Sequence, residues 1–172
     1  MRSFIFGFLI GLILLPLCAW LYVRFGYAPV ATASSPMLFE RRLASMALKA
    51  RIEKEAPKNA PLQATNDNLI AGAHVYRTHC AVCHGLPGQP DYPAATGMFP
   101  KPPQLFKGHG VTDDPPGETY WKVTNGIRLT GMPAYADSLK EDERWQVSLM
   151  LADADKLSPD ARTVLSQPLD IR

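Results

Sequence analysis

The stretch Cys80-Ala81-Val82-Cys83-His84 decides the expected fold, because two thiols three residues apart are followed at once by an imidazole. This spacing is the attachment pattern of a c-type haem. On one helical turn both sulfurs can face the same porphyrin edge and form thioethers with its vinyl groups, while the adjacent ring reaches the iron. The stretch therefore predicts one covalently bound haem c, attached through Cys80 and Cys83 and ligated by His84.

Two other chemistries use the same residue types. A thioredoxin-type redox pair has this cysteine spacing, but it follows a strand of a βαβ unit, and the residues before Cys80 have helical periodicity. A structural zinc site normally has a second pair of ligands, and the remaining cysteine, Cys18, lies far upstream in an apolar run. Both alternatives fit the sequence less well than haem.

Length and charge limit the possible functions. The 172 residues suffice for one medium domain with appendages. Residues 1–65 carry eight Lys/Arg against three Asp/Glu, whereas residues 66–172 carry ten against thirteen. This distribution argues against nucleic-acid binding. It fits a basic stem, within residues 1–65, that lies near lipid headgroups and carries an acidic head of residues 66–172. The chain has neither a Gly-rich phosphate loop nor a serine-nucleophile motif, so we expect an electron carrier without a small-molecule substrate.

An apolar segment opens the chain. Residues 4–23 are uncharged and are flanked by Arg2 and Arg24, and as a helix they would span about 30 Å, one hydrocarbon core. The small residues 31–33 resemble a signal peptidase site, so cleavage remains an alternative to a retained anchor. The length of the apolar run favours the anchor.

A second helix is expected over residues 36–56. Its residues Phe39, Leu43, Met46 and Ala50 step by four, three and four, which predicts an apolar stripe on one face. Such a stem could pack on the head domain or a partner subunit, or it could lie on the membrane surface. The pattern alone does not name the partner.

The helix that carries the haem motif is expected to begin near residue 67, with Asn66 or Asp67 as its N-cap. Gly72, Tyr76 and Cys80 recur every four residues, so they share one face. Gly72 is expected to leave a gap into which another helix packs closely.

The second half of the head alternates loop and helix. Residues 85–116 contain many prolines and glycines, which predicts a long irregular segment that wraps the cofactor. A short helix over 118–125 should end at Gly126, and a last long helix is expected over 141–154 with Trp145 on its buried face. Two histidines before the haem motif, His74 and His79, are expected to face solvent.

The sixth iron ligand is expected in the loop between those two helices. Met132 stands between Gly131 and Pro133, which favours a positioned thioether over core filler. Met98 and His109 are the competing ligands, and Met98 is the better substitute because its side chain is also a thioether.

Taken together, these features resemble class I c-type cytochromes over residues 66–156. The resemblance rests on Gly72, Tyr76, the Cys80–His84 motif, residues 103–105, residues 125–127, residues 131–135 and Trp145. It implies that Gly72 and Tyr76 pack against Trp145, and that the Pro103 carbonyl accepts a hydrogen bond from the outer nitrogen of the His84 ring. It also implies that the haem is attached outside the cytoplasmic membrane.

The sequence thus predicts an all-α protein with the cytochrome c fold, in which three to five helices surround one covalently bound haem. A transmembrane helix and an amphipathic stem helix are expected to precede this domain. The expected parts are an anchor over 1–24, a stem and linker over 25–65, a haem domain over 66–156 and a C-terminal tail over 157–172.

The expected function is one-electron transfer in a respiratory chain by a His84/Met132-ligated haem c. The haem domain would be tethered to the cytoplasmic (inner) membrane on its periplasmic side and would exchange electrons with redox protein partners. Two alternatives are a haem subunit of a larger membrane oxidoreductase complex and a haem-based gas sensor in which a diatomic ligand displaces Met132.

Overall fold

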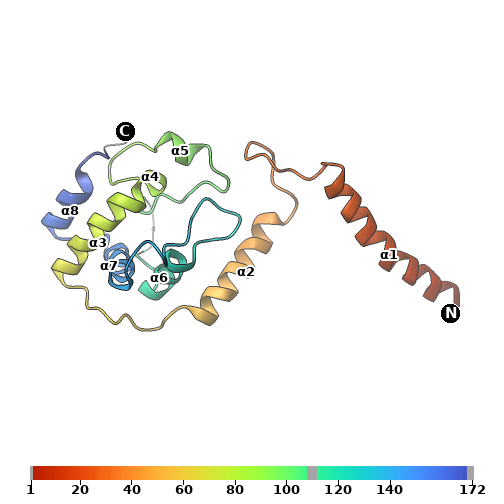
Figure 1. Cartoon of the computed structure of the whole chain (residues 1–172), viewed down its shortest axis with the longest axis horizontal. Coiled ribbons are helices and arrows are strands. Elements are labelled where there is room, and N and C mark those ends of the chain that lie inside the picture. Colours follow the sequence, from red (N-terminus) through yellow and green to blue (C-terminus); the bar gives the residue numbers. More distant parts are fainter. Residues whose placement is uncertain (1, 108–111, 170–172) are drawn as a thin grey trace. The chain divides into compact units, whose positions relative to one another are not determined.

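The computed structural model describes residues 2–107 and 112–169, and every regular element in these two ranges is a helix (Figure 1). The expectation of an all-α fold is confirmed. The chain folds as two compact units that divide between Leu43 and Ala44. His109, one of the competing iron ligands, lies outside the described residues.

The first unit is dominated by helix α1, Arg2–Arg24. Its segment Phe4–Arg24 has a mean hydropathy of 2.5 and is long and apolar enough to cross a membrane, a property that it shares with signal sequences. The large apolar side chains of this segment are exposed along the whole helix. An exposed apolar helix of this length is stable in lipid, where its backbone hydrogen bonds are satisfied internally.

Helix α2, Glu40–Glu55, is apolar on two opposite faces. Ile52 and Ala56 are buried and Leu48 is half-buried, so this face packs within the second unit. Successive residues of a helix are about 100° apart, so this buried face lies about 180° around the helix axis from the apolar stripe that the sequence suggested. The stripe itself is exposed, by 58% at Phe39, 64% at Leu43 and 59% at Met46. Periodicity therefore indicated an apolar face correctly but did not indicate the face that packs.

The head domain is built on the crossing of α3, Asn66–His79, with α7, Glu141–Ala152. Helix α3 begins after Thr65, whose hydroxyl accepts from the Asn68 N–H at 3.4 Å, so the N-cap lies one residue before Asn66 and two before Asp67, the expected caps. A Cβ at Gly72 would overlap the Gln146 carbonyl group and come within 2.8 Å of the Met150 Cβ. Gly72 therefore permits the close helix approach that the sequence suggested.

Trp145 has an aromatic neighbour on a third helix. The atoms nearest to Gly72 belong to Gln146 and Met150, and the Trp145 ring stacks on Tyr120 with centroids 4.1 Å apart. Tyr120 comes from α6, Pro116–Asn125, which also packs on α7. Trp145 thus joins α7 to α6, and its packing against Gly72 and Tyr76 stays a prediction.

A further helix follows α7 where the sequence suggested only a tail. Helix α8, Pro159–Ser166, begins at Ser158, whose hydroxyl accepts from the Ala161 N–H at 3.3 Å. It packs against α3 and buries Ala161, Val164 and Leu165. The spacing of three and four between these residues is the helical signal that the sequence interpretation missed.

Two single-turn helices complete the head. Helix α4, Ala81–His84, follows α3 directly, and α5, Pro93–Thr96, lies in the proline-rich segment. The stretch from residue 97 to 107 contains no helix or strand. The long irregular segment is therefore present, as the prolines and glycines predicted.

Candidate haem site

The junction of α3 and α4 brings the motif residues onto one tight turn. The Cys80 N–H donates to the Tyr76 carbonyl at 2.8 Å and ends α3. The Cys80 carbonyl then accepts from the N–H groups of Cys83 at 3.1 Å and His84 at 2.9 Å. Both thiols and the imidazole consequently belong to one rigid local structure.

Cys80 lies in a dry environment. Burial raises the pKa of the Cys80 thiol to about 12, and the nearby Cys83 adds to the rise. A thiol with so high a pKa is protonated at neutral pH, whereas a redox-active thiol of the thioredoxin kind needs a depressed pKa. The environment of Cys80 therefore does not favour the redox-pair alternative.

The His84 ring is held in one orientation by a distant carbonyl. Its Nδ1 lies 2.9 Å from the Pro103 carbonyl oxygen, which can only accept, so Nδ1 carries the proton. Burial lowers the pKa of His84, and the hydrogen bond to Pro103 partly opposes this shift. The ring is then neutral, with the Nε2 lone pair available to a metal.

Two tyrosines hold the backbone on either side of the motif. The buried Tyr76 hydroxyl donates to the Gly85 carbonyl at 2.7 Å, directly after His84. The Tyr135 hydroxyl donates to the His79 carbonyl at 2.9 Å, directly before Cys80. Burial raises the pKa of Tyr135 to about 12, so its hydroxyl stays a donor. The role of Tyr135 was not evident from sequence, because the two groups are 56 residues apart.

An apolar cavity of about 460 Å³ adjoins this turn. Its size is typical of sites that enclose a cofactor. Its walls come from α2, the motif turn, the proline-rich segment, α6, the loop after α6 and α7, and its sulfur and imidazole groups belong to His79, Cys80, Cys83, His84, Met98 and Met132. Two thiols, a neutral imidazole and thioethers around an apolar space are the donor set that suits a covalently attached haem.

Met132 is held at the cavity by the geometry of its loop. Gly126 ends α6 with a φ of 65°, and a Cβ there would lie within 2.9 Å of the Met132 carbonyl oxygen. The Ile127 N–H donates to that oxygen at 3.2 Å, and the Met132 N–H donates to the Thr130 hydroxyl at 3.1 Å. These bonds fix the backbone from which the thioether reaches the cavity.

Met98 reaches the same part of the cavity. Its methyl group occupies the space that a Cβ at Gly131 would need, immediately beside Met132. The site thus presents two thioethers close together. Met132 remains the predicted ligand, because its loop is fixed on both sides by hydrogen bonds.

The two histidines upstream of the motif differ from each other. His74 is exposed, as expected. His79 is only partly exposed and lines the cavity, and its ring meets the Tyr135 ring edge-on with centroids 5.9 Å apart. The expectation that His79 faces solvent is wrong, because Tyr135 covers one side of it.

A second, more open hollow of about 630 Å³ lies between α2 and the start of α6. None of its lining residues is a cysteine, histidine or methionine. The larger hollow therefore lacks haem-ligating groups, and the chemistry is concentrated in the smaller cavity.

The chain is similar to known proteins over the region that contains this cavity. The family model described as "Cytochrome C oxidase, cbb3-type, subunit III" matches residues 67–149. A chain of the Kuenenia stuttgartiensis reducing HAO-like protein complex is 30% identical over 56% of this chain, with a TM-score of 0.48. The present chain spans 48% of the length of that chain. No curated protein matches the sequence.

Proposed function

We propose that residues 67–149, which match a cytochrome family model, form a class I c-type cytochrome domain, and that the protein carries single electrons on one haem c held by Cys80, Cys83, His84 and Met132. The observation that supports the proposal best is that these four residues line the same apolar cavity. The match of the family model over this region supports the same cofactor.

The axial residues set the chemistry of the site. A bound haem c supplies one-electron chemistry at its iron. The neutral Nε2 of His84 would hold one axial position, and the bond from Nδ1 to Pro103 fixes the tautomer and increases the basicity of the ring. The uncharged sulfur of Met132 would favour the ferrous state and so raise the reduction potential.

The cavity walls and the loop of Met132 complete the mechanism. The lining is mostly apolar, so it excludes water and gives the metal a medium of low polarity. His84 and Met132 would together hold the iron from this chain, which would leave no position open for substrate. The protein then transfers an electron without changing its ligands.

The proposed location follows from the first unit. Helix α1 is long and apolar enough to serve as a membrane anchor, and a haem of this type is attached outside the cytoplasmic membrane. We place the haem domain on the periplasmic side, tethered by α1. There it would take electrons from a dehydrogenase or a quinol-oxidising complex and pass them to a terminal acceptor of a respiratory chain.

Intact-protein mass spectrometry tests both the cofactor and the anchor. The expected mass equals that of the full chain plus one haem, with the pigment resisting extraction by acidified acetone. A mass without haem would contradict the proposed function. A haem-bearing mass without residues 1–33 would contradict only the tether.

The axial sulfur is tested by a pair of matched substitutions. In Met132→Ala we expect loss of the near-infrared sulfur-to-iron band of the oxidised protein, because the axial thioether is absent. In Met98→Ala we expect the band to remain, because Met98 lines the same cavity but is not the proposed ligand. The opposite pattern would assign the ligand to Met98.

A second candidate is a haem subunit of a larger membrane oxidoreductase. It is favoured by the matching family model, which describes an oxidase subunit, and by the exposed apolar stripe of α2. Purification in mild detergent separates the two candidates. Stable co-purification of catalytic subunits would favour the complex, whereas purification of this protein alone would favour the carrier.

A further inference from the structure

The Pro103 carbonyl belongs to a segment that has no regular structure to hold it. Residues 101–107 contain neither helix nor strand, and Pro102 and Pro103 have no N–H to donate. A turn closes just beyond, where the Lys107 N–H donates to the Gln104 carbonyl at 3.1 Å. The position of the Pro103 carbonyl therefore depends on side chains.

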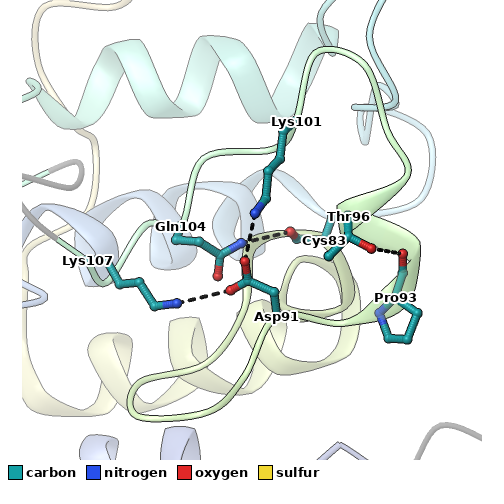
Figure 2. Close-up of polar contacts among 7 residues, drawn as sticks. All are labelled: Cys83, Asp91, Pro93, Thr96, Lys101, Gln104 and Lys107. Carbon is teal, nitrogen blue, oxygen red and sulfur yellow. Dashed lines mark hydrogen bonds and ion pairs between the residues drawn. The ribbon is translucent and has the colours of Figure 1, made fainter. Parts of the chain in front are cut away.

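Asp91 binds this segment at two points, on either side of Pro103. Its Oδ2 accepts from Lys101 Nζ at 2.9 Å, and its Oδ1 accepts from Lys107 Nζ at 3.0 Å (Figure 2). The Asp91 side chain is 21% exposed, whereas the lysines are 53% and 58% exposed. These hydrogen bonds, that from Lys101 first, lower the pKa of Asp91, so the carboxylate is ionised at neutral pH.

Gln104 connects the same segment to the haem motif. In one orientation its Nε2 donates to the Cys83 carbonyl at 3.5 Å (Figure 2). With the amide turned over, its nitrogen donates to the His84 carbonyl at 3.1 Å and to Asp91 Oδ1 at 3.2 Å. Gly85, with a φ of 74°, permits this approach, because a Cβ there would collide with Gln104 Oε1.

We propose that Asp91, Lys101, Gln104 and Lys107 form a polar clamp that positions the Pro103 carbonyl against His84 Nδ1. The four side chains bracket Pro103 and tie it to the turn that carries His84. They are positioning residues, since the hydrogen bond to the ring is made by the Pro103 carbonyl. The inference rests on the proposed function, in which His84 is the axial ligand.

The clamp has a chemical consequence for the iron. A well-placed acceptor at Nδ1 makes the imidazole a stronger donor, which stabilises the ferric state and lowers the reduction potential. Loosening the clamp weakens the hydrogen bond. The potential should then rise, whichever member of the clamp is removed.

Hydrogen exchange of the His84 Nδ1–H gives the direct test. It is measured by NMR on the reduced full-length holoprotein in detergent, for wild type, Asp91→Asn and the double variant Lys101→Gln/Lys107→Gln. We expect exchange to be about fivefold faster or more in both variants, because the Pro103 acceptor spends less time in place. Unchanged exchange in both variants would overturn the clamp.

The sign of the change in reduction potential distinguishes a positioning effect of the clamp from a direct electrostatic effect of its charges. Removal of a carboxylate raises the potential through space, whereas removal of two ammonium groups lowers it. Loss of positioning raises it in both cases. We therefore expect a higher potential in Asp91→Asn and also in Lys101→Gln/Lys107→Gln. Shifts of opposite sign would overturn the proposal.

Two controls complete the design. Asp137→Asn removes an exposed carboxylate from the loop after Tyr135 and should leave the exchange rate unchanged. Asp91→Glu keeps a carboxylate for both lysines and should restore part of the protection. A wild-type protein without a haem-ligated His84 resonance would overturn the proposed function itself. A wild type that shows this resonance, together with variants that exchange at the wild-type rate, would overturn only the clamp.

Discussion

His84 takes its properties from residues that are far from it in sequence. Its neutral state comes from burial, and its tautomer comes from Pro103, 19 positions further on. The peptide groups around the motif are likewise fixed by Tyr76 and Tyr135. A three-residue attachment motif thus depends on at least three outside side chains or carbonyls for its geometry.

The bond from Tyr76 to Gly85 is a testable case at this scale. In Tyr76→Phe the buried Gly85 carbonyl loses its donor, which should lower the free energy of unfolding by about 1–3 kcal/mol. The measurement is guanidinium unfolding of the holoprotein, followed by circular dichroism.

Tyr92→Phe is the matched control, because the Tyr92 hydroxyl makes a long 3.4 Å contact to Gln89 and is only part-buried. The control should change the stability by less than about 0.5 kcal/mol. Equal effects of the two substitutions would contradict a special role for the Gly85 carbonyl.

The roles of some single residues could be predicted from the sequence, and those of others could not. Gly72 and Gly126 were predicted correctly, because a missing side chain and a helix stop have local signatures. Tyr135 and Gln104 lie in segments that carry the resemblance, but their hydrogen bonds to the motif turn were not predicted. Their partners, His79 and the motif carbonyls, are remote in sequence, and a hydrogen bond across that separation leaves no periodic signal.

Helix α2 differs from an ordinary amphipathic helix because it has two apolar faces, of which one is buried and one is exposed. Its buried face includes Ile52 and Ala56, and Trp121 of α6 donates to Glu55 at 3.1 Å near its end. Leu48 even reaches the wall of the haem cavity. The stem therefore contributes to the head domain through its second half.

Substitutions on the two faces of α2 should have unequal effects. Ile52→Ala removes a side chain that is 5% exposed and should lower the unfolding free energy by about 2–5 kcal/mol. Met46→Ala changes a side chain that is 59% exposed and should cost less than about 0.5 kcal/mol. Both are measured by guanidinium unfolding in detergent.

The comparison of Ile52→Ala with Met46→Ala also tests whether a partner subunit covers the exposed stripe. A strong loss of stability in Met46→Ala alone would contradict the assignment of the faces. A loss of co-purifying subunits in Met46→Ala, without a loss of stability, would support the second candidate function.

At the scale of the whole molecule, the head domain is only partly built from helix contacts. Helices α3, α6, α7 and α8 pack around the crossing at Gly72. The irregular segment from 85 to 107 instead adjoins an apolar cavity of about 460 Å³. A large flat apolar cofactor, such as the proposed haem, would supply the buried surface that this segment lacks.

Loss of the cofactor should therefore loosen one part of the molecule before the rest. In Cys80→Ser/Cys83→Ser, which cannot form the thioethers, we expect limited proteolysis within residues 86–107 to be at least about tenfold faster than in the holoprotein. Fragments that end inside α3 or α7 should appear later, since these helices keep their own contact. Mass spectrometry of the fragments identifies the sites, and uniform cleavage along the chain would contradict the expectation.

The sequence by itself determined the all-α class, the apolar first helix, the haem motif and the irregular proline-rich segment. These features are local, because helical period, hydrophobic length, ligand spacing and backbone-breaking residues can be recognised without knowing what packs against them. The resemblance to class I cytochromes rests on several such signals in the right order, and the matching family model covers residues 67–149.

Only the tertiary structure decided which face of α2 is buried, that α8 covers α3, and that Asp91 and its lysines bracket Pro103. Each of these depends on a contact between segments that are distant along the chain. Periodicity and composition describe what a segment can offer to a neighbour, whereas the choice of neighbour is made by the packing of the whole domain.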